Sequence, residues 1–144
     1  MGRNLKTVTS DQLRKLIKQS GAGGFLGRGT RLFDREYALF SISEIDARVQ
    51  AAISSLFDDG ITDQSYADNG ADCDNFALLI QAEVMKAWML ENKGKTSYPA
   101  IAFGSGIMPK HSVNVGICED GVRIWNYGTL TDWNPSELFE VEIR

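Results

Sequence analysis

The sequence predicts an α+β fold in a single domain spanning residues 1–144, on three observations. The chain is long enough to bury a core, with 43% hydrophobic and 24% charged residues among 144. Apolar residues recur at helical spacing through the first two thirds of the chain. In the last third they alternate with a period of two, as in strands. Helices followed by an antiparallel sheet are typical of the α+β class.

Three helices are expected. The first is capped by Ser10 and ends at Gly21. The second begins after Ser43, and the third runs from Asp72 or Cys73 to Asn92 and closes at Gly94. Each has one apolar face: Leu13, Leu16 and Ile17 in the first; Ile45, Val49, Ala52, Ile53 and Leu56 in the second; Phe76, Leu79, Ile80, Val84, Ala87 and Trp88 in the third.

Two loops separate these helices. Five glycines lie between positions 21 and 29, but the Lys-Ser/Thr ending of a phosphate-binding loop is absent, so a flexible surface loop or lid is expected. The segment 57–75 contains six aspartates and neither lysine nor arginine. It is predicted to be a turn-rich, acidic loop that leads into the third helix.

The last third predicts one strand over 98–106, a hairpin over 111–128 and a final strand over 137–144. Asp120-Gly121 would form the two-residue hairpin turn, which pairs Val115 with Asn126. A slip of two residues would keep every side chain on its face and bring Asn126 closer to the start of the first strand.

With either register, His111 and Asn126 share one apolar face of the hairpin, because residues two apart on a strand point the same way. That face must pack on a helix, and we expect the long helix headed by Cys73 to be its partner. Cys118 has the opposite parity and is expected to point away. Trp125, also of opposite parity, is expected to cover the other sheet face.

Composition excludes several classes of function. A net charge of −4 argues against general binding to nucleic acids or anionic membranes, which needs clustered Lys and Arg. No apolar run is long enough to span a membrane, and the N-terminal residues lack the apolar core of a signal peptide. Two cysteines are too few for a disulfide framework. We expect free thiols and an intracellular, cytoplasmic protein, which could include the cytoplasm of a host cell.

Cysteine at a helix start, histidine opening a strand and asparagine on the next strand together suit nucleophilic catalysis. The positive end of a helix and a nearby imidazole both favour the thiolate of Cys73. His111 can then protonate the leaving group, while Asn126 holds its ring in one tautomer. The free amide N–H at the helix start can donate to the developing oxyanion.

These motifs resemble the papain-like and transglutaminase-like cysteine peptidase superfamily. The likeness is greatest to small phage and bacterial domains related to the C-terminal protease domain of mushroom agglutinins. It rests on Asp72-Cys73-Asp74 at the helix start, on the spacing of His111 and Asn126, and on the upstream Asp34-Arg35-Glu36-Tyr37, and it covers about residues 33–135. The resemblance implies a papain-like core whose nucleophile helix packs on an antiparallel sheet.

The resemblance also implies a function: a cysteine hydrolase, peptidase or isopeptidase, that acts through an acyl-enzyme on a peptide or protein substrate. Acyl transfer is a variant of the same mechanism. The alternative is a catalytically inactive phage inhibitor or structural adaptor on the same fold. The sequence departs from the family pattern at two positions that matter for this function. Ala67 occupies the position of the papain-type oxyanion glutamine, which leaves Gln64 and Asn69 as candidates, and the agglutinin relatives prefer Glu at the position of Asn126.

The aspartates beside Cys73 have several interpretations. Asp72 suits a helix N-cap. An acidic rim would raise the thiol pKa and favour basic substrates. The agglutinin relatives are calcium-activated, so Asp72 and Asp74 are candidate Ca²⁺ ligands, although the loop lacks the EF-hand spacing. The predicted chemistry itself requires no cofactor.

Overall fold

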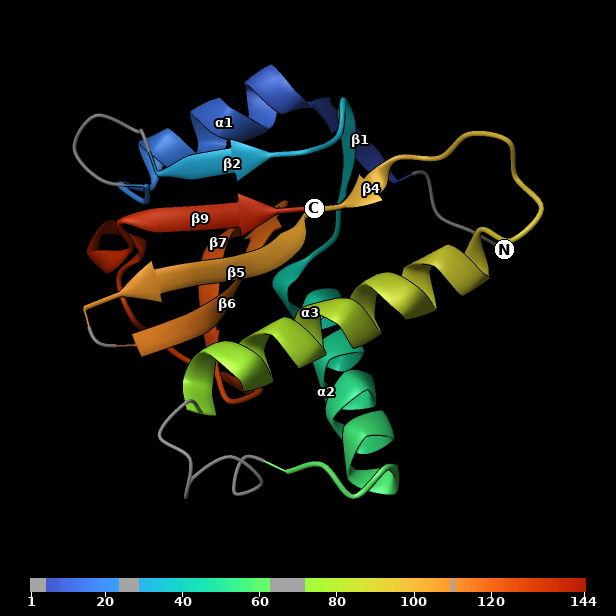
Figure 1. Ribbon diagram of the computed structural model, residues 1–144. Coiled ribbons are helices and arrows are strands. Elements are labelled where there is room, and N and C mark those ends of the chain that lie inside the picture. The colour runs from blue at the N-terminus through green and yellow to red at the C-terminus, as the bar shows by residue number, and fades with distance from the viewer. Residues whose placement is uncertain (1–4, 24–28, 63–71, 110) are drawn as a thin grey trace.

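The α+β class is confirmed. The computed structural model describes residues 5–23, 29–62, 72–109 and 111–144, with the backbone alone at 72–74. Its helices are α1 (Ser10–Gln19), α2 (Ile42–Asp58), α3 (Asp72–Glu91) and the short 3₁₀ helix η2 (Pro135–Glu137) (Figure 1). The strands are β1 (Lys6–Thr9), β2 (Thr30–Leu32), β3 (Glu36–Leu39), β4 (Ala100–Ile101), β5 (Phe103–Met108), β6 (His111–Cys118), β7 (Gly121–Asn126), β8 (Thr129–Leu130) and β9 (Glu140–Ile143).

The strands form two sheets, and both are mixed. The smaller has the order β1-β3-β4 and the larger the order β2-β9-β5-β6-β7-β8. The β3–β4 and β2–β9 pairs are parallel, so the prediction of an antiparallel sheet is wrong for them. Both pairs join segments far apart in the sequence, and alternation within a segment carries no information about such partners.

The helices begin and end on local signals. Thr9, rather than the expected Ser10, caps α1: its hydroxyl accepts from the Gln12 amide at 3.2 Å, and the Gln12 side chain accepts from the Thr9 amide at 2.9 Å. Ser41 and Glu44 form the same capping box on α2. Gly21 follows α1 at φ +86°, a left-handed conformation that favours glycine.

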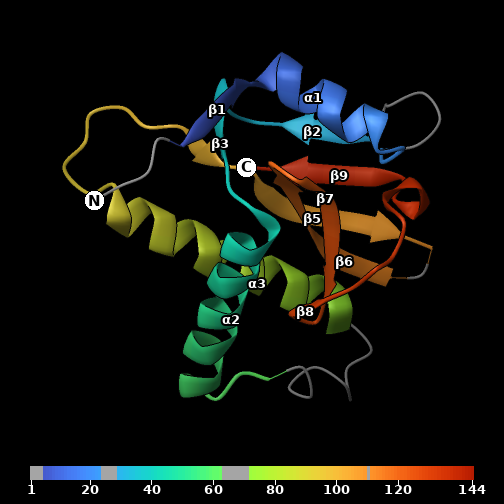
Figure 2. The ribbon, with the colours of Figure 1, turned by 180° about the vertical axis from the view of Figure 1, so that it is seen from behind.

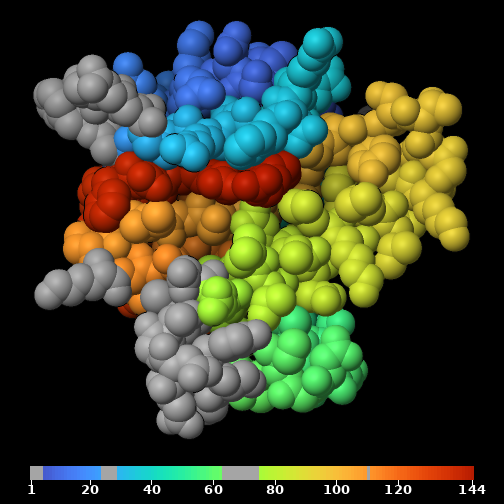
Figure 3. Space-filling model, in the orientation of Figure 1, coloured from blue at the N-terminus to red at the C-terminus, as the bar shows by residue number. Residues whose placement is uncertain are grey.

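Two cores pack against the larger sheet, one on each face. Leu13 and Ile17 of α1 join one core, whereas α2 and α3 supply the other through residues such as Val49 and Ile80. Figure 2 shows α1 along β2, away from the crossing of α2 and α3. In the space-filling view, α1 and β2 (blue) and α2 (green) lie at opposite ends, with the strands and α3 between them (Figure 3). In α3, Ala87 is exposed, unlike the rest of the expected apolar face.

The β6–β7 hairpin follows the slipped register. Cys118 pairs with Gly121, so that Glu119 and Asp120 form the turn, and Val115 pairs with Ile124. The predicted Asp120-Gly121 turn is therefore displaced by one residue, and the pairing by two. Each side chain of the hairpin still lies on the expected face of the sheet, as the alternative register predicts.

The prediction of which helix covers which face of the hairpin is wrong. Val113 and Val115 pack in the core of α1, whereas Cys118 and Trp125 pack in the core of α2 and α3. Every residue from 113 to 118 is buried, because the strand is covered on both sides. Alternation cannot assign a helix to a face when both faces are apolar. Trp125 does lie opposite to the His111 face, as expected.

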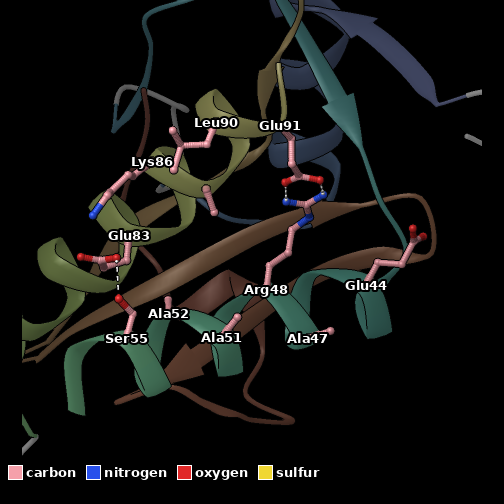
Figure 4. Close-up of a pocket in the computed structure, with 11 residues that line it drawn as sticks. Glu44, Ala47, Arg48, Ala51, Ala52, Ser55, Glu83, Lys86, Leu90 and Glu91 are labelled. Carbon is pink, nitrogen blue, oxygen red and sulfur yellow. Dashed lines mark hydrogen bonds and ion pairs between the residues drawn. The ribbon is translucent and has the colours of Figure 1, made fainter. Parts of the chain in front are cut away.

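Helices α2 and α3 are joined across their outer side by two polar contacts. Arg48 donates to both Glu91 oxygens at 2.5 and 3.0 Å, and the Ser55 hydroxyl donates to Glu83 at 3.2 Å. Between these contacts lies an open hollow of about 610 Å³ floored by alanines, including Ala51 (Figure 4). The Arg48 guanidinium also lies 4.6 Å from the centre of the Phe40 ring, which orders it.

Replacing Glu91 with glutamine should destabilise the fold by at most about 1 kcal/mol, since its side chain is half exposed. The hydrogen bonds from Arg48 lower the Glu91 pKa, against a smaller opposing effect of burial. A pKa lowered by folding stabilises the protein above the ordinary glutamate pKa, and this contribution disappears as pH falls. Urea denaturation of both proteins at pH 7 and pH 3 should show the difference only at pH 7. A difference that persists at pH 3 would contradict the assignment.

Candidate active site

The structure brings His111 and Asn126 together. His111 opens β6, Asn126 ends β7, and the His111 Nε2 lies 2.5 Å from the Asn126 Oδ1. An amide oxygen only accepts, so Nε2 carries the proton and donates it. In the neutral ring Nδ1 is then the unprotonated nitrogen, able to take a proton from another group. The pair therefore presents a base in one defined tautomer.

Two aromatic rings flank the half-buried imidazole. The Tyr127 ring centre lies 5.7 Å from that of His111, and the Trp133 ring centre lies 6.2 Å away. On the Trp133 side an open cavity of about 680 Å³ is lined by Met108, Pro109, His111, Trp133 and Glu137. The imidazole thus borders a space that could receive a ligand.

Tyr127 was missed by the sequence reasoning, although it links His111 to α3. Its ring also lies 5.8 Å, centre to centre, from the ring of Phe76 on α3. Tyr127 and Gly128 form a two-residue turn between β7 and β8, with φ of 48° and 82°. Positive φ at both positions marks a type I′ turn, and for tyrosine it is a strained conformation of the kind found at functional sites. The tyrosine-glycine pair before β8 was the available signal.

Position 73 lies in the first turn of α3, one turn before Phe76, whose ring contacts Tyr127. It precedes Phe76 by three residues and Ala77 by four, which places the three on one helix face. That face meets β6, because the Asn114 amide donates to the Ala77 carbonyl at 2.8 Å. The first amides of a helix have no intrahelical acceptor and are available to an anion. The side chain of Cys73 lies outside the described residues.

The remaining predicted site residues are not tested by the structure. The side chains of Asp72 and Asp74 lie outside the described part, as do Gln64 and Asn69 entirely. Among the residues that are described, no group of three or more His, Cys, Asp and Glu side chains could hold a metal. Calcium binding therefore stays a prediction, and no chemical step is assigned to it.

The Asp34–Tyr37 segment has a structural role. The Tyr37 hydroxyl accepts from the Phe33 and Asp34 amides at 3.0 and 2.9 Å and donates to the Ile143 carbonyl at 3.3 Å. The tyrosine is fully buried. It joins β3 to the end of β9, at a distance from His111 in the sheet order.

Cys118 provides an unreactive reference thiol. It is 5% exposed and free. Burial raises the pKa of its thiol to about 12, with a further increase from Asp120. Only the thiolate is nucleophilic, so Cys118 should resist alkylation while the protein is folded.

Replacing Gly128 with alanine should destabilise the fold by about 2–3 kcal/mol, through backbone strain and overpacking. A Cβ at this position would lie 2.6 Å from Ile53 and would sit at φ +82°. Gly60 is a matched control, with φ +78° and open space around its Cβ position. Gly60→Ala should lose only about 1 kcal/mol, the cost of conformation alone. Equal losses in chemical denaturation would contradict the packing argument.

Comparison with known proteins identifies a similar fold. No family model and no curated protein matched the sequence. Among the solved structures that match, the "PSL1a-E64 complex" superimposes with a TM-score of 0.67 and 17% sequence identity. The match covers 95% of this chain and 51% of that one, so the chain spans about half the length of its neighbour. At this identity the likeness shows a shared fold and no more.

None of the helices in the described residues is long and apolar enough to cross a membrane.

Proposed function

We propose that the protein is a papain-like cysteine hydrolase acting on peptide or isopeptide bonds through Cys73, His111 and Asn126. The observation that carries the proposal is the His111–Asn126 hydrogen bond of 2.5 Å at the strand ends. This pair is joined through Tyr127 to Phe76, one helical turn after Cys73. Nucleophilic catalysis needs a base with a fixed tautomer within reach of a thiol, and Cys73 would supply that thiol.

In the proposed mechanism, His111 Nδ1 removes the thiol proton and the Cys73 sulfur attacks the substrate carbonyl carbon. The carbonyl π electrons move to oxygen, and the Cys73 amide N–H stabilises that charge. When the C–N bond breaks, Nδ1 returns the proton to the leaving amine. Water then attacks the thioester with the same base, which regenerates the thiol and releases the carboxylic acid. Asn126 orients the imidazole and accepts from its Nε2–H throughout.

The ligand of the structural neighbour gives a practical probe. E64 is an epoxide, and a thiolate can open its ring to form a stable thioether. We propose that E64 is a ligand of this chain as well. A covalent adduct at Cys73, found by mass spectrometry of the intact and digested protein, would support the assignment. The reduced thiol that this chemistry requires fits the expected cytoplasmic location.

Alkylation kinetics test the nucleophile and base directly. Iodoacetamide at neutral pH should modify Cys73 at least about tenfold faster than Cys118, because only an accessible thiol of lowered pKa is largely ionised. His111→Ala should slow the reaction of Cys73 and leave Cys118 unchanged. Peptide mapping after timed quenching gives both rates in one sample. The catalytic assignment is wrong if Cys73 is alkylated no faster than Cys118, or if His111→Ala leaves the alkylation rate of Cys73 unchanged.

A peptide library then separates the hydrolase from the alternative. Turnover should occur in a reducing buffer with a chelator, since the mechanism requires no metal, and a parallel arm with millimolar calcium tests the aspartates of the first α3 turn. Gln64→Ala and Asn69→Ala test the two proposed oxyanion donors. Absence of turnover in both arms would favour a non-catalytic inhibitor or adaptor on the same fold.

A further inference from the structure

The cavity beside His111 has a composition that the proposed mechanism does not use. Three of the described residues that line it present apolar surface: Met108, Pro109 and Trp133. Met108 is nearly fully buried and fixed in the α1 core, and Trp133 packs against the same core. The apolar walls are therefore held by the fold. At about 680 Å³ the cavity has room for a long side chain.

Among the described residues of this lining, Glu137 is the one ionisable side chain besides His111, and its position is set by short-range structure. Glu137 ends η2, where the Asn134 side chain caps the turn by accepting from the Ser136 amide at 3.0 Å. The Glu137 amide donates to the Asn134 carbonyl at 3.0 Å, and the next residue, Leu138, is fully buried. Within the described residues, no hydrogen bond or ion pair to the Glu137 carboxylate is found. Among the described residues that line the cavity, this carboxylate therefore has no cationic partner.

We propose that this cavity is a subsite for a cationic side chain, lysine or arginine, and that Glu137 determines the preference. Its role as a substrate subsite rests on the proposed function, whereas the binding of the cation does not. The aliphatic stem of lysine or arginine packs on Met108 and Pro109, as long charged side chains do on apolar surface. The charged end reaches the Glu137 carboxylate, and the Trp133 ring adds an attraction for the cation.

A binding measurement tests the subsite without requiring turnover. N-acetyl-lysine methylamide and N-acetyl-norleucine methylamide have the same stem and differ in the terminal ammonium. Each is titrated into the isotope-labelled protein while the three tryptophan indole N–H signals are followed by NMR. The Trp133 signal should move, and those of the buried Trp88 and Trp125 should stay. Lysine should bind about 3- to 10-fold more tightly than norleucine, as expected for an exposed ion pair with an aromatic neighbour.

Variants assign this preference to one carboxylate. Glu137→Gln should make the two compounds bind equally, and Glu137→Lys should reverse the order. Glu36→Gln, an exposed position in the smaller sheet, is the matched control and should change nothing. The lysine preference should also weaken at high salt, which screens exposed charges. Equal binding of both compounds to the wild type, no binding by either, or a preference that survives Glu137→Gln would each overturn the inference.

The two proposals fail in different ways. If iodoacetamide modification of Cys73 depends on His111 but lysine is not preferred, the hydrolase stands and the subsite is lost. If lysine is preferred through Glu137 while Cys73 is unreactive, the cavity remains a cation site and the hydrolase is lost. In an active enzyme, the best library peptides should carry lysine or arginine next to the cleaved bond, and Glu137→Gln should reduce that selectivity about 3- to 10-fold.

Discussion

Replacing His111 with alanine should reduce kcat/KM on the best library peptide by about 10²–10⁴-fold, the usual contribution of general acid–base catalysis. The chain contains one histidine, so no neighbouring imidazole can substitute. The imidazole is half buried and its hydrogen bond is to one side chain, so the fold should survive its removal. The measurement is steady-state turnover, accompanied by a thermal melt to verify folding.

Two variants calibrate that result. Asn126→Ala should have a smaller effect, because it loosens the imidazole without removing it, and its alkylation rate at Cys73 should fall between those of the wild type and His111→Ala. Cys118→Ala removes the buried reference thiol and should leave turnover within about twofold, since it lies outside the mechanism. A folded His111→Ala protein with wild-type kcat/KM would exclude His111 as the base.

Replacing Trp125 with alanine should lower the free energy of unfolding by about 3–5 kcal/mol, the range for large aromatic-to-alanine changes in cores. The side chain is fully buried and meets the Phe103 ring edge-on at a centroid distance of 5.8 Å. Its indole N–H donates to the Asp46 carboxylate at 2.9 Å, which would lose this partner. Denaturant unfolding monitored by circular dichroism provides the measurement.

The backbone at Gly116 on the neighbouring strand packs closely against the Trp125 ring. A Cβ at Gly116 would lie 2.8 Å from the Trp125 ring, so the glycine permits the close approach. Trp125→Phe keeps an aromatic ring and should lose clearly less stability than the alanine variant. Trp133→Ala, at a half-buried position, should also lose less. If Trp125→Ala unfolds at the same denaturant concentration as Trp133→Ala, the ring does not contribute to the core as described.

The helices could be predicted because their signals are local. Ser or Thr before an apolar period of 3.6 located α1 and α2 to within a residue or two, and Gly21 marked the end of α1. β2 and β1 were missed because each is three or four residues long and has no extended alternation. Their partners are determined by tertiary packing, which a single sequence does not display.

The candidate site, too, could be predicted from the sequence only where its signals are local. The shared face of His111 and Asn126 follows from the period of two along paired strands, and the hydrogen bond between them confirms that part of the reasoning. The assignment of that face to α3 was wrong, because both sheet faces are apolar. Tyr127 was not foreseen, since its role depends on a left-handed turn and on two ring contacts from distant elements.

The parallel pairing of β2 with β9 has a consequence for the kinetics of folding. Thr30 pairs with Val141 and Leu32 with Ile143, so the larger sheet joins opposite ends of the sequence. β9 also pairs with β5, and it therefore lies inside the sheet rather than at its edge. Such long loops must be closed before their contacts are gained, which slows folding. A nascent chain lacking β9 would expose the edges of β2 and β5, and those edges would be open to pairing with other chains until residues 140–143 are in place.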